Sequence, residues 1–235
     1  MQRITPGFYT FTGLLVGRVY LIRDPDGMTL IDTGLGLAAD KILAQIAAAG
    51  GQARQIKRIL ITHAHPDHIG GLPKLKAQTG AQVIASALER PTIEGRQPIP
   101  GPPAEQLPSW VRLLRPPPVT LPGTPVDREV ADGELLPDVM GGLRVIATPG
   151  HAPGHLAFWQ PERRILFCGD VMMRIPRPQL RLPVAAFTVD MAENKRSIRR
   201  LAALDAAMLC LGHGQPLTQQ TAETVRAFAR QVGVG

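Results

Sequence analysis

Three histidines and one aspartate lie within six consecutive positions of this chain, in the segment His63-Ala64-His65-Pro66-Asp67-His68. Imidazole nitrogens and carboxylate oxygens are the side-chain groups that hold zinc and similar divalent cations in proteins. Burying four such groups without partners would cost several kcal/mol each, which disfavours an ordinary core segment. The spacing therefore predicts a metal site, and the alternative is an exposed polar loop that binds no metal.

The three remaining histidines each follow an apolar run and stand beside glycines. His151 and His155 come after the run 143–147, and His213 comes after the run 207–210. An imidazole placed just beyond a buried strand lies at the edge of the sheet that contains that strand. These histidines are therefore candidates for further ligands of the same site.

Asp170 and the histidine-rich segment are placed in the same way, after the apolar runs 164–168 and 58–61. Ligand sites of α/β proteins form where the ends of neighbouring strands meet at one edge of a sheet. We therefore expect side chains that are far apart in the sequence to converge in space.

The order of these motifs resembles that of the metallo-β-lactamase superfamily, and the resemblance extends over nearly the whole chain. The His-x-His-x-Asp-His segment, a later Gly-His, a Gly-Asp and a final Gly-His-Gly follow one another as in that family, and segment 30–34 matches its leading motif. The resemblance implies an α/β protein built as a four-layer αβ/βα sandwich. It places the site at one edge of the molecule, between two sheets.

The resemblance also assigns ligands to two metal ions. The implied ligands are His63, His65 and His151 for one metal, Asp67, His68 and His213 for the other, and Asp170 as a bridge between them. Asp32 would orient the ligand histidines from behind. His155 matches no ligand of the family, and we predict that it is a hydrogen-bonded turn residue.

Two metals about 3.5–4 Å apart can share one water molecule, lower its pKa toward neutrality and polarise a carbonyl group. We therefore predict hydrolysis by a metal-bridging hydroxide, without a serine or cysteine nucleophile. Asp67 is the predicted catalytic residue, which accepts the proton of the water and delivers it to the leaving group. The predicted cofactor is two zinc ions per chain, although iron, manganese and cobalt suit the same ligands.

Length and composition favour one domain over residues 1–235, because 235 residues with 44% hydrophobic and 4% aromatic content can bury a substantial aliphatic core. No apolar stretch approaches the roughly 20 residues of a membrane span. Segment 8–22 is interrupted by glycines and an arginine, so a secretory signal is not expected. Cys168 and Cys210 are predicted to be buried free thiols, and we expect a cytoplasmic location.

The net charge of +7 raises the question of a nucleic-acid partner. The basic residues are scattered, and their densest group, 195–200, is typical of the solvated face of a helix. We therefore expect no nucleic-acid partner. Asn194 is the only asparagine and the chain has 23 prolines, which fits either a thermostable protein or a GC-rich genome.

Hydropathy periods and turn residues predict two halves of alternating strands and helices. The first half comprises strands at 8–12, 17–23, 28–32, 58–61 and 82–85, with helices at 37–49 and 70–79. The second half comprises strands at 143–147, 156–160, 165–168 and 207–211, with helices near 191–204 and 218–232.

A proline-rich insertion occupies about residues 91–125, where eleven of the 23 prolines fall. This density excludes a regular helix or a central strand. The segment is either a surface insertion without a role or a loop beside the site. Trp110 lies in an apolar patch within it, and such a patch needs a partner, either a substrate acyl chain or a second subunit in a homodimer.

The ligand set narrows the substrate class. Glyoxalase II enzymes resemble this site but carry a further C-terminal helical region that binds glutathione, for which segment 214–235 leaves little room. The RNA-processing branch uses an RNA-binding arm, and true β-lactamases usually depart from this ligand set at the position of Asp170. The resemblance therefore favours cleavage of esters, thioesters or phosphodiesters, and the best match is a quorum-quenching N-acyl homoserine lactonase.

A lactonase needs an apolar cleft for the acyl chain of its substrate. The candidates for such a cleft, each of which could equally be ordinary core, are Leu14, Leu15, Val16, Trp110, Met172, Met173 and Phe187. Two features depart from the lactonase pattern. Met173 stands where many lactonases have a tyrosine, and the spacing from His68 to His151 is longer by about the length of the insertion.

Four alternatives to lactone hydrolysis remain open from the sequence. They are a thioester hydrolase of the glyoxalase II type without the glutathione domain, a phosphodiesterase, a metal-binding sensor without turnover, and redox chemistry at a single iron. The intact ligand set argues against a sensor. A metal-binding hydrolase of a small substrate with an apolar acyl chain is therefore the leading prediction.

Overall fold

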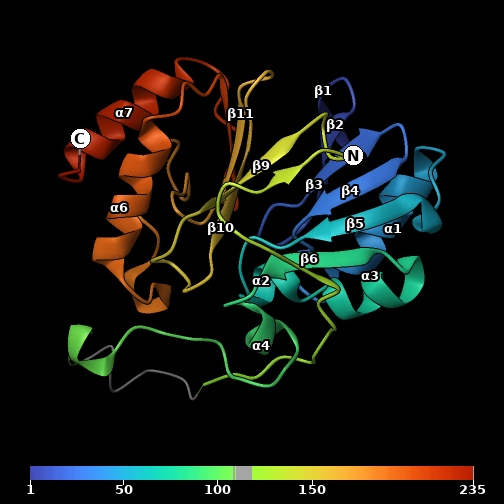
Figure 1. The fold of residues 1–235 in the computed structure, drawn as a ribbon, viewed down its shortest axis with the longest axis horizontal. Helices are drawn as coiled ribbons and strands as arrows, with labels where there is room; N and C mark the ends of the chain where they lie inside the picture. Colours follow the sequence, from blue (N-terminus) through green and yellow to red (C-terminus); the bar gives the residue numbers. More distant parts are fainter. Residues whose placement is uncertain (108, 110–117, 235) are drawn as a thin grey trace.

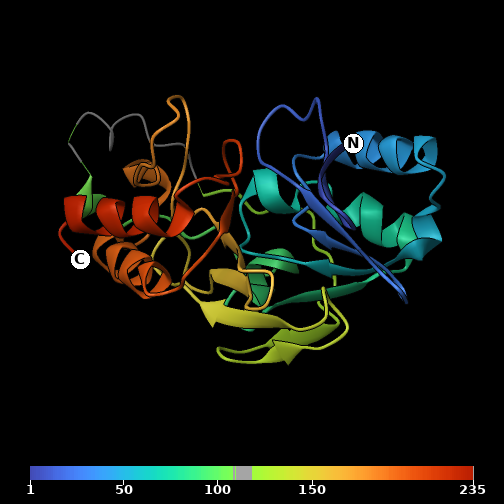
Figure 2. The same ribbon diagram turned by 90° about the horizontal axis from the view of Figure 1, so that it is seen from above.

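Two β-sheets pack face to face in the computed structural model, which describes residues 1–107, 109 and 118–234 (Figure 1). Helices α1 (Ala38–Ala48) and α3 (Leu72–Thr79) cover the outer face of the first sheet, and α6 (Met191–Ala202) and α7 (Thr221–Gln231) cover that of the second. Figure 2 shows the same layers from a perpendicular direction. The predicted four-layer αβ/βα sandwich is confirmed.

Over the residues that the structure describes, the first sheet has seven strands in sequence order. They are β1 (Gln2–Thr5), β2 (Phe8–Thr10), β3 (Tyr20–Asp24), β4 (Gly27–Ile31), β5 (Ile56–Leu60), β6 (Gln82–Ser86) and β7 (Arg128–Val130). Strands β1 to β4 pair antiparallel, and β4 to β7 pair parallel. Parallel strands end at the same edge, so the residues that follow β4 and β5 lie close together.

The second sheet, in the described part of the chain, has five strands in the order β12-β11-β10-β9-β8. They are β8 (Leu135–Leu136), β9 (Leu143–Ala147), β10 (Leu156–Gln160), β11 (Ile165–Gly169) and β12 (Met208–Leu211). Strand β10 is antiparallel to both β9 and β11, while β11 and β12 are parallel. Strands β9, β11 and β12 therefore run in the same direction and end at one edge of the sheet.

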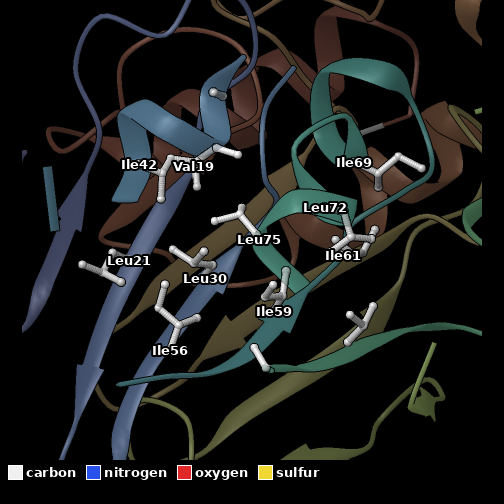
Figure 3. Close-up of a cluster of buried hydrophobic side chains, with 14 of the residues drawn as sticks. Val19, Leu21, Leu30, Ile42, Ile56, Ile59, Ile61, Ile69, Leu72 and Leu75 are labelled. Carbon is white, nitrogen blue, oxygen red and sulfur yellow. The ribbon is translucent and has the colours of Figure 1, made fainter. Parts of the chain in front are cut away.

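Three apolar clusters hold the layers together. An aliphatic cluster that includes Leu30, Ile42 and Leu75 fills the space between the first sheet and its helices (Figure 3). A second cluster lies between the sheets, where the rings of Phe8, Tyr20 and Phe167 contact one another at centroid distances of 5.3 to 5.6 Å. A third cluster packs α6 and α7 against the second sheet.

The strand predicted to begin at residue 17 begins at Tyr20, because the preceding residues form a loop. The Arg18 N–H donates to the Gly212 carbonyl over 2.8 Å, and the Arg18 guanidinium donates from Nε to the Gly214 carbonyl over 2.7 Å. A second loop is held at the same place, since the Arg174 N–H donates to the His213 carbonyl over 3.0 Å. In Figure 2 the two loops (blue and orange) rise on the same side of the molecule.

The proline-rich segment begins with a short helix that the sequence did not predict, α4 (Arg90–Ile93). Proline is tolerated in the first turn of a helix, so Pro91 is compatible with it. The base of the segment is closed by a hydrogen bond of 2.9 Å from the Thr124 N–H to the Ile93 carbonyl. Trp110 lies outside the described residues.

Cys168 and Cys210 are buried free thiols, as predicted. They stand on adjacent strands but on opposite faces of the second sheet, since Cys168 belongs to the cluster under α6 and Cys210 to the cluster between the sheets. Within the described part of the chain, no helix combines the length and apolarity that crossing a membrane requires.

Candidate metal centre

The predicted ligands meet at one edge of the sandwich, where they follow the ends of the four strands β5, β9, β11 and β12. Three overlapping groups have ligand atoms within 4.8 Å of one another, and these groups are His63 with His65 and His151, His63 with His68 and Asp170, and Asp67 with His68 and His213. Four of these side chains follow β5 in the first sheet, and the other three follow β9, β11 and β12 in the second. The structure thus brings all seven predicted ligands together.

A single helical turn, α2 (Pro66–Ile69), presents Asp67 and His68. His65 before it has extended backbone, and Pro66 occupies the first helical position, where its fixed φ favours initiation of a helix. This change from strand-like to helical backbone lets neighbouring residues contribute to different groups. The four-residue segment from His65 to His68 therefore supplies ligand atoms to all three clusters.

The distances between ligand atoms suit a cation at their centre. His213 Nε2 lies 3.0 Å from Asp67 Oδ2 and 3.1 Å from Asp170 Oδ2. His65 Nδ1 lies 3.0 Å from His151 Nε2. Ligand atoms about 2.0–2.1 Å from a tetrahedral zinc ion lie about 3.3–3.4 Å from one another. The side chains are therefore spaced as ligands of a divalent ion would be.

Three ligand atoms at the centre are buried and have no hydrogen-bond partner within the described residues. They are His63 Nε2, His68 Nε2 and Asp170 Oδ1. Nearly all buried polar atoms in folded proteins are paired, so three unpaired ones in one place require an explanation. Bound cations supply it, because each atom can donate a lone pair to a metal. The residues present therefore fit a pair of divalent ions.

Asp32 supports this centre from behind. Its carboxylate accepts the Thr62 N–H at Oδ1 and the Thr62 hydroxyl at Oδ2, both over 2.8 Å, and Oδ2 also lies 2.8 Å from His68 Nδ1. Asp32 itself has a φ of 61°, in the left-handed region that aspartate tolerates better than most residues. The contact fixes the His68 ring with Nε2 directed toward Asp170, 3.4 Å from Oδ1.

The imidazoles fall into two electrostatic groups. Burial lowers the pKa of His65 to about 3 and that of His151 to about 4. Burial also lowers the pKa of His213, but hydrogen bonds to Asp170 and Asp67 outweigh it and raise that pKa to about 9. At neutral pH, His65 and His151 are therefore neutral and ready to bind a cation, whereas His213 carries a proton that a cation must displace.

Metal binding is accordingly expected to release at least one proton. His213 has a raised pKa of about 9, so its proton is present near neutral pH and is lost as the pH rises through that value. A metal binds only the neutral imidazole, so affinity should fall as the pH falls. Calorimetric titration of metal-free protein in buffers of different ionisation enthalpy measures this release. Heats that do not depend on the buffer would contradict the prediction.

His155 has a larger part in the centre than the sequence indicated. It is fully buried, and its Nδ1 lies 2.8 Å from the Thr148 hydroxyl, which confirms the predicted hydrogen-bonded turn residue. Its Nε2 also accepts the Asp170 N–H over 3.1 Å, and its ring stacks on His63 with centroids 4.9 Å apart. His155 therefore positions the backbone of Asp170. The only signal in the sequence is its repetition of the Gly-His pair four residues after His151.

Gly212 leaves room for the Asp170 carboxylate. A Cβ at this position would lie 2.0 Å from Asp170 Oδ1 and 2.9 Å from His68 Cε1. Gly212→Ala should therefore displace Asp170 and lower metal occupancy at least about tenfold, as disturbance of ligand orientation commonly does. Elemental analysis after dialysis provides the measurement. Gly36→Ala is the matched control, because a Cβ there meets only the Gly70 carbonyl at an ordinary 3.7 Å.

Only some of the side chains predicted to contact a substrate are exposed at the surface. Leu14 is partly buried, while Leu15 and Val16 are exposed, Leu15 by 79%. Leu14, Leu15 and Val16 line a shallow pocket. Their loop packs on the metal centre, since a Cβ at Gly17 would lie 2.3 Å from the Asp67 carbonyl. The backbone of the loop that carries these three side chains therefore lies against the segment that carries Asp67.

The residues after β11 that were predicted to contact a substrate also include both exposed and buried side chains. Phe187 is 60% exposed, and the neighbouring Thr188 hydroxyl lies 3.1 Å from His151 Nδ1. Met173 is almost buried and pairs by its backbone with Arg181. Met172 is fully buried in the cluster under α6, where it offers no surface to a substrate, so we leave it out of the proposed contacts.

Neither tyrosine of the chain takes the place of the lactonase tyrosine. The Tyr20 hydroxyl donates to the Leu211 carbonyl over 2.8 Å from within the core between the sheets. Tyr9 packs at the first sheet, with the Arg23 guanidinium 5.2 Å from its ring centroid. A substrate carbonyl at the centre therefore has no phenol beside it among the described residues.

This fold, with histidines and aspartates gathered at the strand ends, defines an αβ/βα sandwich with a candidate dinuclear metal site. The chain belongs to the Metallo-beta-lactamase superfamily, whose family model matches residues 12–213. It is a metallo-hydrolase of that superfamily, and its relatives include enzymes of the glyoxalase II type.

Among the relatives, the chain is 29% identical over 221 residues to the probable metallo-hydrolase YflN of Bacillus subtilis (strain 168), which covers 86% of this chain and 82% of YflN. It is 32% identical over 184 residues to a hydroxyacylglutathione hydrolase of Rhodospirillum rubrum, covering 77% of this chain but 58% of that enzyme. Its fold matches the crystal structure of a metallo-beta-lactamase family protein from Thermus thermophilus, with a TM-score of 0.72, 29% identity and coverage of 97% of this chain and 81% of that one.

Proposed function

We propose that the protein holds two divalent ions, zinc first among them, and hydrolyses a small ester-like substrate, with an N-acyl homoserine lactone as the leading candidate. One observation carries the proposal. The seven ligand side chains form three overlapping clusters, and the buried atoms at their centre have no other partner among the described residues. When bound, two such ions supply a water of lowered pKa as nucleophile and polarise the carbonyl that it attacks.

The two carboxylates of the centre have different roles in the proposal. The Asp170 side chain is 3% exposed, so no substrate reaches it, whereas the Asp67 side chain is 20% exposed. Burial raises the pKa of Asp67, but the hydrogen bond to His213 and the charges of nearby imidazoles have the larger effect, so the net pKa is lowered. The carboxylate is therefore ionised and able to accept a proton. Asp67 therefore takes the proton of the nucleophilic water and returns it to the leaving oxygen.

The acyl chain of the substrate would lie between two loops. Leu15 and Val16 project from the loop that packs on Asp67, and Phe187 lies one residue before Thr188, whose hydroxyl contacts His151. Exposed apolar side chains on both sides of a polar centre suit a substrate with a reactive carbonyl and an apolar tail. A lactone with an acyl chain has both features.

Thioester hydrolysis is the second candidate, and the absence of a nearby tyrosine among the described residues favours it. A thiol leaves as a weak base with a pKa of about 8.5, so its departure depends less on proton donation than that of an alcohol. The chain also resembles hydroxyacylglutathione hydrolases, although it spans 58% of the length of the Rhodospirillum rubrum enzyme. This chain would therefore recognise a thioester substrate without the part of the Rhodospirillum rubrum enzyme that lies outside the matched region.

A substrate panel tests the proposal. Protein loaded with zinc is assayed on N-acyl homoserine lactones of several chain lengths, on acyl thioesters and on bis(p-nitrophenyl) phosphate, with bound metal counted by elemental analysis. Preference for lactones supports the leading candidate, and preference for thioesters supports the second. Preference for the phosphodiester, or inactivity of protein that holds two metals, would overturn the assignment to carboxylic esters.

A further inference from the structure

Glu89 is a buried acidic residue outside the ligand set. It follows strand β6 and directly precedes the short helix α4, and its side chain is 2% exposed. Burying a carboxylate is costly unless hydrogen bonds compensate for the lost hydration. The partners of Glu89 therefore indicate why the chain places a charged group there.

Both carboxylate oxygens of Glu89 accept backbone N–H groups from the ligand loops. Oε2 accepts the N–H of Ala64, which lies between His63 and His65, over 2.8 Å. Oε1 accepts the N–H of Gly154, which lies three residues after His151, over 2.7 Å. One loop follows β5 of the first sheet and the other precedes β10 of the second, so a single side chain joins the two halves at the centre.

No lysine or arginine of the described residues pairs with Glu89. Burial raises the pKa of its carboxyl, and only the bonds from Gly154 and Ala64 oppose that effect. A neutral side chain would cost less to bury, but Gln has one acceptor oxygen where Glu has two. Two acceptors aimed at two N–H groups are what this position requires.

Close packing restricts the same loop from the other side. A Cβ at Gly154 would lie 2.7 Å from Ser86 Oγ, 2.8 Å from Leu88 Cβ and 3.0 Å from Glu89 Cγ. The loop that carries His151 is therefore pressed onto segment 86–89, with no space for a larger residue. Contact and hydrogen bonding together fix its distance from the loop of His63 and His65.

We propose that Glu89 is a positioning residue that sets the separation of these two loops, and with it the affinity of the metal site formed by His63, His65 and His151. The inference rests on the proposed dinuclear centre and deepens it. Neither of the hydrogen bonds of the Glu89 carboxylate goes to a residue of the second site, which consists of Asp67, His68 and His213. The two sites should therefore respond differently when Glu89 is changed.

Cobalt binding to metal-free protein tests this inference, with visible absorption as the report on ligand geometry. We expect the Glu89→Gln variant to bind one of its two equivalents of cobalt about 10–100-fold more weakly, with altered absorption bands. The affinity and the absorption bands of the other equivalent should be unchanged. The weakened equivalent should be the one that His151→Ala removes, whereas His213→Ala removes the other. Glu129→Gln is the matched control, because Glu129 is on β7, next to β6, and its ion pair among the described residues is with Arg90 at the surface.

Wild-type affinity and absorption for both equivalents in Glu89→Gln would overturn the inference, as would an equal loss of both. If the Glu89→Gln variant does not fold, cobalt binding to Gly154→Ala is measured instead and judged by the same two outcomes. This substitution displaces the same loop without changing a charge. A wild-type protein that binds no cobalt would overturn the proposed function itself. If only the positioning role of Glu89 is wrong, the wild-type protein and the Glu89→Gln variant will each bind two equivalents of cobalt with the same affinities.

Discussion

Asp170→Asn is expected to remove most of the bound metal and to lower turnover by about 10³-fold or more. The Asp170 carboxylate lies 3.1 to 3.6 Å from nitrogens of His68, His151 and His213. Asparagine keeps the shape but removes the negative charge that offsets the repulsion between two cations. Because such ions supply several kcal/mol of transition-state stabilisation, losing them costs at least three powers of ten.

Elemental analysis and turnover on the best substrate of the panel measure the effect of Asp170→Asn. Asp205→Asn serves as the control, because Asp205 forms an exposed ion pair with Arg164 just before β11 and β12 begin, at the ends of these strands opposite to the metal centre. Circular dichroism should show that both variants are folded. An Asp170→Asn protein that keeps two metals and turns over normally would exclude the bridging role.

Asp67→Asn should retain its metals when they are supplied in excess, yet turn over about 10²–10⁴-fold more slowly. An amide oxygen can still contact a cation, but an amide cannot carry a proton at neutral pH, and proton transfer by a positioned group contributes about this factor. The effect should fall mainly on kcat, because in the proposed role Asp67 would act on the reacting atoms and not on the remainder of the substrate. The loss should also be smaller for thioesters than for lactones, since a thiolate needs less protonation to leave.

The control for Asp67→Asn is Asp40→Asn, at an exposed carboxylate that pairs with Lys74. Metal content must be determined on the same samples that are assayed. If metal-loaded Asp67→Asn has near-normal kcat, the proton carrier is another group and the proposed role of Asp67 is wrong.

The buried strands could be predicted because their runs are mainly apolar and bounded by turn residues. Strands β9 (Leu143–Ala147) and β10 (Leu156–Gln160) have the predicted boundaries. Among the described residues, the strands and α-helices without a counterpart in the sequence analysis are short, namely β1, β7, β8, α2 and α4. Such elements depend on pairing with distant residues, as when β7 adds to β6, and their own sequences carry little periodicity.

The ligands could be predicted because their side chains carry the chemistry and their spacing is distinctive. The contacts of Glu89 and His155 with the ligand segments could not be predicted, because these side chains accept backbone N–H groups that almost any residue would provide. Substrate contacts were the least predictable part. Met172 and Met173 are adjacent in the sequence, and only the fold shows that the first belongs wholly to the core.

The ligands come from both halves of the sandwich, four after β5 and three from the ends of β9, β11 and β12. Cations held by them would bind the native chain and not the unfolded chain, so they would shift the folding equilibrium by mass action. At a free metal concentration about 1,000 times the dissociation constant, this linkage contributes about 4 kcal/mol per ion. The folded population of this protein, and its survival against proteolysis, would therefore follow the metal supply of the cell.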